Sequence, residues 1–258
     1  MATPNPAQQI ADDIRSLQSK VGGLQGNVRL TKARDAVEDL QTTVIGLTQQ
    51  IASLRTRGYF FEKEMENQAV TYVQSWARLY PNLQSQINMQ SSALINSLRP
   101  IEMQMPQLSA AASNPAAARG LLGSMQSAIN MLEDKVSATE KSIEGMYDQF
   151  NNQVHQLTKH LSEIEYLVKQ LAEATFQLLP TEGGILAIKA VWCKTGKEQK
   201  GDPEGVLYLT DQRILFEQKE EIVTKKVMFV VTEKQKVQQL LIECPVTLVD
   251  KVETSKLG

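Results

Sequence analysis

The sequence predicts an α+β protein of two parts, an elongated helical bundle or coiled coil followed by a small antiparallel β-domain. Two observations predict it: a seven-residue apolar repeat within residues 1–179, and short apolar runs between Gly- and Pro-containing loops across residues 181–258. With 258 residues, 42% of them hydrophobic, the chain can bury two modest cores. We therefore expect two domains that meet near residue 180.

Four helices are predicted within the first part. Apolar residues recur at helical spacing over about 6–25, 31–57, 59–99 and 119–179. Between the last two lies a predicted connector, residues 100–118, which contains three prolines and an Ala-rich run. A compact connector makes the helices on either side antiparallel, which predicts an elongated bundle of three or four helices.

The apolar stripe changes phase between the first two helices, at Gly22-Gly23 and Gly26-Asn27. Two interpretations remain, a turn between two helices or one long helix with a kink or register shift. We favour a break, because Gly-Asn is a good helix stop and Thr31 can cap a restart. In the third helix, Pro81 predicts a kink or a split.

The last predicted helix has the most regular repeat. Apolar residues occupy every seventh position from Leu122 to Leu178, whereas the companion seam weakens at Gln153 and His160. The apolar stripe widens there, which suits a bundle better than a two-stranded coiled coil. Because heptads do not reveal whether the partner helix belongs to the same chain, we also expect a possible homo-oligomer through the helices.

Pro180 ends the helical part, and we interpret Gly183 and Gly184 as a hinge. Beyond it the sequence predicts an antiparallel meander of about six strands. They lie at 185–192, in a hairpin over 205–216, at one or two places within 221–231, and at 240–244 and 246–254.

A turn at Asp211 and Gln212 fixes the pairing within the hairpin. It places Leu209 opposite Ile214 and Leu207 opposite Phe216 on one side, with Tyr208 opposite Leu215 on the other. Because the first set is wholly apolar, we expect Leu207, Leu209, Ile214 and Phe216 to form the core of the β-domain.

The hairpin Gly205-Val-Leu-Tyr-Leu-Thr-Asp-Gln-Arg-Ile-Leu-Phe216 and the later Val246-Thr-Leu-Val-Asp-Lys-Val252 together resemble the GRAM and bacterial PH-like domains. The resemblance covers residues 183–258 and leaves the helices unassigned. It implies a small, strongly bent sheet that binds lipid headgroups, peptides or partner proteins without catalysis. Such domains close with further strands and a helix, so we expect that the chain is a fragment or that another element, such as an N-terminal helix, covers the open end.

The resemblance also implies candidate ligand- or lipid-binding residues. Phosphoinositide-binding relatives cluster Lys and Arg on the first two strands and the loop between them, and the matching residues are Lys189, Lys194, Lys197, Lys200 and Arg213. Glu198, Asp202 and Glu204 dilute this positive charge.

Composition and motifs exclude several classes of function. Residues 1–179 carry 15 Lys+Arg against 17 Asp+Glu and residues 180–258 carry 12 of each, which argues against binding to nucleic acid or strong attraction to anionic membranes. No Gly-rich phosphate loop, His-Glu-x-x-His, Cys-x-x-Cys or Gly-x-Ser-x-Gly motif occurs. The histidines His155 and His160 are five residues apart, whereas two metal ligands on one helix need a spacing of three or four. We therefore predict no enzyme, no metal and no cofactor.

We predict a non-enzymatic scaffold or adaptor, in which the bundle mediates oligomerisation or spacing and the GRAM/PH-like domain binds a protein partner or a membrane-lipid headgroup. The alternative is a peripheral membrane-remodelling protein of BAR-like logic whose helical surface contacts lipid, which the near-neutral helical part disfavours. Without a secretory signal or a spanning segment, we expect a cytoplasmic protein, at the inner face of a membrane if lipid is the partner. Cys193 and Cys244 are then expected to be reduced.

Overall fold

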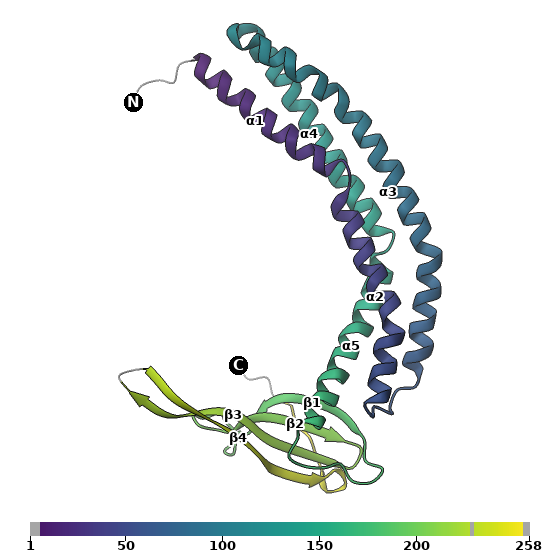
Figure 1. Ribbon diagram of the computed structural model, residues 1–258, viewed down its shortest axis with the longest axis vertical. Helices are drawn as coiled ribbons and strands as arrows, with labels where there is room; N and C mark the ends of the chain where they lie inside the picture. The colour runs from purple at the N-terminus through teal and green to yellow at the C-terminus, as the bar shows by residue number, and fades with distance from the viewer. Residues whose placement is uncertain (1–5, 228–229, 255–258) are drawn as a thin grey trace. The chain divides into compact units, whose positions relative to one another are not determined.

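The computed structural model describes residues 6–227 and 230–254, which are helical at first and then form an antiparallel sheet (Figure 1). The helices are α1 (Pro6–Asn27), α2 (Thr31–Thr56), α3 (Glu64–Ala110), α4 (Pro115–Gly145) and α5 (Asp148–Ala172), with the 3₁₀ turn η1 (Ala111–Ser113). The strands are β1 (Gly184–Val191), β2 (Glu204–Thr210), β3 (Arg213–Val227) and β4 (Val230–Pro245), followed by the 3₁₀ turn η2 (Val246–Leu248). The predicted α+β layout is confirmed.

Contacts divide the chain into two units. The first contains the described residues up to Ile45 together with Thr71–Val154, and the second contains Gly46–Val70 and the described residues from His155 on. The helices α2, α3 and α5 therefore contribute to both units. The boundary predicted at residue 180 is a statement about independent folding, which this division by contacts does not address, so it stays a prediction.

The first unit is a helical bundle in which α3 runs antiparallel to α1 and α2 and lies beside α4 (Figure 1). Side-chain hydrogen bonds agree with this antiparallel direction, because later residues of α1 and α2 pair with earlier residues of α3. The pairs are Gln18 with Ser109, Gln25 with Glu102, Arg34 with Asn88, and Gln41 with Trp76. Heptad residues such as Ile129, Val136 and Ile143 are buried within this single chain. The repeat therefore requires no second chain, and self-association through the helices stays a prediction.

The predicted break between the first two helices is confirmed. α1 and α2 are separated by a turn in which Leu30 has a positive φ of 53°. Thr31 opens α2 without the predicted cap, since its hydroxyl donates a hydrogen bond to the carbonyl of Gly26 at 3.3 Å. The turn is part of the core, where the hydroxyl of the buried Ser91 on α3 donates to the carbonyl of Val28 at 3.1 Å.

We expect Ser91→Ala to lower the free energy of unfolding by about 1–2 kcal/mol, because the buried carbonyl of Val28 loses this donor. Ser92→Ala is the matched control: the Ser92 hydroxyl is exposed and bonds only one turn back, to the carbonyl of Asn88 at 2.9 Å. Its removal should change stability by less than about 0.5 kcal/mol. Urea denaturation measures both variants, and equal losses would show that the Ser91 contact contributes nothing specific.

The predicted connector is wrong, because α3 continues through three prolines, Pro81, Pro100 and Pro106. Pro81 therefore does not split the helix, and the connection shrinks from the predicted 100–118 to residues 111–114. Each proline removes one helical donor, but Leu83 and Ile101 beside them are buried in the bundle. Packing of the apolar face thus outweighs the local penalty.

The predicted helix over 119–179 consists of two helices. α4 ends at Gly145 and α5 begins at Asp148, and Met146 between them keeps helical angles of φ −73° and ψ −24°. The interruption is therefore local. The last helix also stops earlier than predicted, at Ala172, because the amide of Thr175 donates to a distant carboxylate, Glu217, at 2.6 Å.

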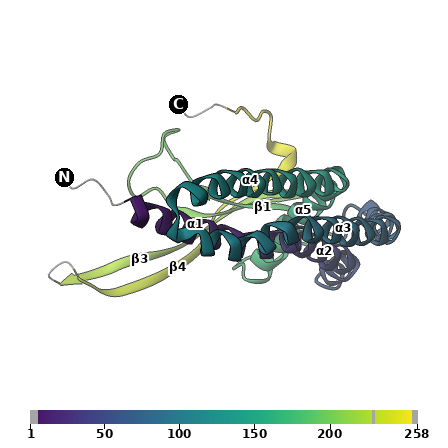
Figure 2. The same cartoon turned by 90° about the horizontal axis from the view of Figure 1, so that it is seen from above.

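The strands follow the order β1-β2-β3-β4 with every neighbouring pair antiparallel, so the predicted meander is confirmed for four strands of the described chain. The hairpin register is also as predicted: Leu207 pairs with Phe216, Tyr208 with Leu215, and Leu209 with Ile214. Beyond Gln218, β3 and β4 continue as a two-stranded ribbon (Figure 2). The predicted strand over 246–254 is wrong, since only η2 forms there and Leu248 and Val252 are 69% and 77% exposed.

The buried face of the hairpin is the opposite of the predicted one. Among the four predicted core residues only Phe216 is buried, whereas Leu207, Leu209 and Ile214 are half-buried. Tyr208 and Leu215 on the other face are fully buried. The reason is that α5 packs on that face, where the Tyr208 hydroxyl lies 3.4 Å from the Gln170 carbonyl.

The predicted hinge glycines are buried and held by contacts within the second unit. The amide of Gly183 donates to the Asp211 carboxylate at 2.9 Å, and the Asp211 amide donates to the Gly183 carbonyl at 3.1 Å. A Cβ on Gly183 would lie 2.6 Å from the ring of Phe61, and one on Gly184 would lie 2.6 Å from Leu171. Glycine here allows close approach of neighbouring elements.

Candidate binding surfaces of the sheet unit

One face of the sheet is apolar across all four strands and only half-covered. Two cross-strand rows form it: Leu186, Leu209, Ile214 and Cys244, then Ile188, Leu207, Phe216 and Ile242. We call these eight residues the open face. Leu186 and Ile188 on the edge strand β1 are 38% and 43% exposed. Trp192 packs against Phe216 with a ring separation of 6.3 Å, which explains why Phe216 alone is buried.

The opposite face, which we call the helix-covered face, contains buried polar groups that form hydrogen bonds within the unit. The fully buried carboxylate of Glu217 accepts hydrogen bonds from the Thr175 amide at 2.6 Å, the Thr175 hydroxyl at 2.7 Å and the Tyr208 hydroxyl at 3.1 Å. Burial, together with this carboxylate, raises the pKa of Tyr208 well above its usual range, so the phenol remains a donor. These bonds fix the end of α5 on the sheet.

Arg213, a predicted ligand residue, is 7% exposed and points into the unit. Its guanidinium donates to both oxygens of Glu182, at 3.0 and 2.5 Å, to Glu243 at 2.5 Å and to the carbonyl of Gln177 at 3.0 Å. Burial disfavours the charged form of Glu182, but hydrogen bonds from Arg213, the Leu179 amide and Thr210 outweigh it and lower its pKa. We therefore assign Arg213 a structural role.

The four predicted lysines are exposed, but they belong to different places in the unit. Lys194, Lys197 and Lys200 lie in the loop between β1 and β2, where the Lys194 ammonium sits 4.9 Å from the ring centroid of Trp192. Lys189, on β1, belongs to the row Lys189–Val206–Glu217 of the helix-covered face. There it lines a pocket with two lysines that the sequence analysis missed.

This pocket, which we call the lysine pocket, has a volume of about 630 Å³ and lies among α5, β1, β2 and β3. Its lining includes Tyr166 and Lys169 of α5, Lys189 of β1, Glu204 of β2 and Lys219 of β3. The three lysines lie 20 and 30 residues apart in the sequence. No local signal joins them, because only the packing of α5 on the sheet brings them together.

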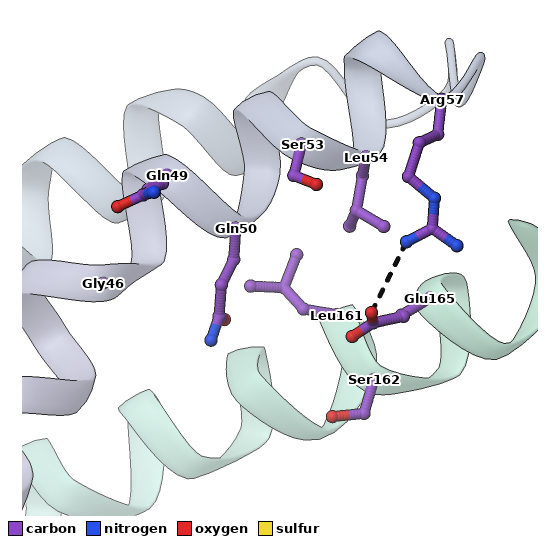
Figure 3. A pocket seen from close by; sticks show the side chains of 9 residues that line it. All are labelled: Gly46, Gln49, Gln50, Ser53, Leu54, Arg57, Leu161, Ser162 and Glu165. Carbon is purple, nitrogen blue, oxygen red and sulfur yellow. Dashed lines mark hydrogen bonds and ion pairs between the residues drawn. The ribbon is translucent and has the colours of Figure 1, made fainter. Parts of the chain in front are cut away.

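A second, polar pocket of about 370 Å³ lies between α2 and α5 in the same unit (Figure 3). Gln49, Gln50 and Ser162 are among its lining, and its two charged groups, Arg57 and Glu165, pair with each other at 3.4 Å. These groups offer hydrogen bonds but no unmatched charge. Among the residues that the structure describes, no group of three His, Cys, Asp or Glu is placed to hold a metal ion. None of the helices within the described ranges offers an apolar stretch sufficient to span a bilayer.

Comparison with known proteins identifies no family, since no family model matches the chain and no curated protein resembles it in sequence. The GRAM and PH-like identity of residues 183–258 therefore stays a prediction.

Proposed function

We propose that the protein is a non-enzymatic helical scaffold or adaptor whose sheet is a PH/GRAM-like docking module, and that the open face binds an extended apolar segment of a partner protein. The observation that carries this proposal is the half-exposed pair of apolar rows across four strands. These eight apolar residues are neighbours across four strands, and contiguous exposed apolar residues of this kind mark interaction sites.

The edge of the sheet supports an extended partner. β1 is an edge strand, and besides the open-face residues it exposes Ile185 and Val191, with Lys189 as its one charged residue. Edge strands are usually protected by several charges, prolines or cover, because their free backbone groups pair with other strands. A peptide that adds a strand to β1 would gain backbone hydrogen bonds and set alternate side chains on the open face.

Size and charge argue against other occupants. A stable dimer uses about 20–30 residues on each partner, well above the eight residues of the open face. An anionic lipid surface is disfavoured because Lys194, Lys197 and Lys200 of the neighbouring loop are matched by Glu198, Asp202 and Glu204. For the helices we propose a spacing role, since the 47 residues of α3 correspond to a contour of about 70 Å.

Selection of a random-peptide phage library on the immobilised full chain tests this function. We expect enriched peptides with alternating apolar residues, whose dissociation constants rise at least about tenfold in the variant Ile188→Lys. Ile188 is 43% exposed, so the substitution should leave the fold intact, which circular dichroism checks. Lys197→Glu in the exposed loop is the control and should bind normally.

The proposal fails if no peptide is enriched over an albumin-coated surface, or if both variants lose binding equally. Salt-sensitive sedimentation with phosphatidylserine vesicles, unaffected by Ile188→Lys, would favour the membrane-remodelling alternative.

A further inference from the structure

We propose that the hairpin formed by α3 and α4 is a self-association surface, on which a second copy of the chain docks. The surface consists of residues 79–132, which comprise the last part of α3, η1 and the first part of α4, and we call it the neutral hairpin. All of it belongs to the first unit. The inference therefore goes beyond the docking function, which uses the sheet of the second unit.

The neutral hairpin is almost free of charge. Three of its 54 residues are charged, Arg99, Glu102 and Arg119, against 22% of the whole chain. Helices that face water normally carry charged side chains over their outer surface. Depletion of charge is instead typical of the centres of protein interfaces, where methionine is also enriched. The composition therefore indicates a surface that another protein surface covers.

The outer side of α3 is exposed along the whole neutral hairpin. The buried residues of this helix, such as Leu94, face the bundle, so the heptad positions are already occupied within the chain. On the outer side, Met89 and Met103 are 55% and 74% exposed. Arg99 is the one charged residue among the exposed residues at 81–110. This part of α3 thus presents methionines and uncharged polar groups to solvent.

The chemistry of the exposed side favours a second copy as its partner. Asn, Gln and Ser make up half of the exposed residues at 81–110, and their side chains both donate and accept hydrogen bonds. The exposed Pro100 and Pro106 also remove the helical donors of the Asn96 and Glu102 carbonyls. Because the same groups meet across a two-fold axis, amides of one copy can donate to carbonyls of the other. The surface is thus complementary to itself and brings few like charges together.

Two other partners fit this surface less well. A helix that lies on a membrane uses Trp, Phe or Leu on its apolar face and several Lys or Arg on the other. The exposed residues at 81–110 contain no aromatic or leucine side chain and only Arg99 as a cation. A partner protein recognised by charge is disfavoured for the same reason, since the surface has almost no charge that could select it.

The neutral hairpin is large enough for a stable dimer. It exposes 18 residues at 81–110 and 11 more at 111–114 and 116–132. Each partner of a stable interface contributes about 20–30 residues. An interface that uses most of this surface therefore reaches the required size, which the eight residues of the open face do not.

Sedimentation equilibrium of the full chain tests the proposal. We expect the molar mass to rise from the 28.7 kDa of one chain to twice that value as the concentration rises from about 1 to about 100 μM. The triple variant Met89→Glu, Asn96→Glu, Met103→Glu places like charges on both copies and should raise the dissociation constant at least about tenfold. All three residues are exposed, so the fold should persist, which circular dichroism checks.

The triple variant Gln74→Glu, Gln153→Glu, Gln156→Glu is the matched control. It adds the same charge to exposed helical residues outside the neutral hairpin and should change the dissociation constant by less than about twofold. Raising the salt concentration from about 0.05 to about 0.5 M should change association of the wild-type chain by less than about threefold, because screening has few charges to act on.

A chain that remains monomeric over the whole concentration range overturns the proposal. A dimer that survives the three substitutions on α3, or an equal loss in the control variant, also overturns it, because the contact then lies elsewhere. The peptide selection depends on the open face and uses none of these residues, so failure of one proposal leaves the other standing.

Discussion

Arg213→Ala should destabilise the sheet unit by about 3–5 kcal/mol, the cost of leaving a buried charge without its partner. The side chain of Glu182 has no solvent exposure and receives two hydrogen bonds from the guanidinium, at 3.0 and 2.5 Å. Water cannot replace these donors without opening the core between Gly183 and the β2–β3 turn. Urea denaturation of the full chain, followed by tryptophan fluorescence and circular dichroism, measures the loss.

The double variant Arg213→Met, Glu182→Gln is the control for this prediction. It removes both charges while keeping side chains of similar size, so it should be more stable than Arg213→Ala alone. A loss below about 1 kcal/mol in the single variant would mean that the buried pair contributes little.

The same pair gives a pH dependence. Because the folded-state pKa of Glu182 lies below its ordinary value of 4.5, its contribution to stability is complete above that value and is lost as the pH falls through the lowered pKa. Arg213→Ala removes the cation that favours the ionised form. The stability difference between the wild-type chain and the variant should therefore grow as the pH rises from about 3 to 6.

Gly205→Ala is expected to cost about 3 kcal/mol, at the upper end of overpacking effects. A Cβ on Gly205 in β2 would overlap the backbone carbonyl of Glu217 in β3, and a main-chain atom cannot rotate away as a side chain can. The two strands would have to separate at the pair Gly205–Gln218. This separation would weaken the hydrogen bonds between Glu217 and Thr175 at the end of α5.

Gly46→Ala is the matched control in the same unit. Gly46 lies within α2, and beyond the neighbouring residues and backbone of its own helix no atom lies within 4 Å of the added Cβ, so the substitution should stabilise the chain by up to about 1 kcal/mol. Thermal and urea denaturation of the two variants should therefore move in opposite directions. A Gly205→Ala variant as stable as the wild-type chain contradicts the close strand contact.

The elements whose causes are local could be predicted from the sequence. The turn between α1 and α2 follows from Gly26-Asn27 and the phase change of the apolar stripe, and the hairpin register follows from a two-residue turn at Asp211 and Gln212. Pairing in a hairpin is set by its turn, so neighbouring residues contain the needed information.

Features that depend on distant partners could not be predicted in this way. The side of the hairpin that was not expected to form the core contains the polar residues Thr210, Arg213 and Glu217, and each is buried with a partner from outside the hairpin or across its turn. The end of α5 and the lysine pocket likewise depend on contacts across more than 20 residues. Periodicity shows that two faces differ without showing which face an element 40 residues away will cover.

The buried hydrogen bonds of Glu217 also limit how this sheet can be recombined with other proteins during evolution. Recombination that carried only residues 181–258 into another gene would leave Thr175 and Gln170 behind. The carboxylate of Glu217 and the hydroxyl of Tyr208 would then lose these partners and become exposed to solvent. The last turns of α5 would have to travel with the strands. We therefore expect natural recombination of this sheet to keep the residues from Gln170 on together with the strands, well before Gly183 and Gly184.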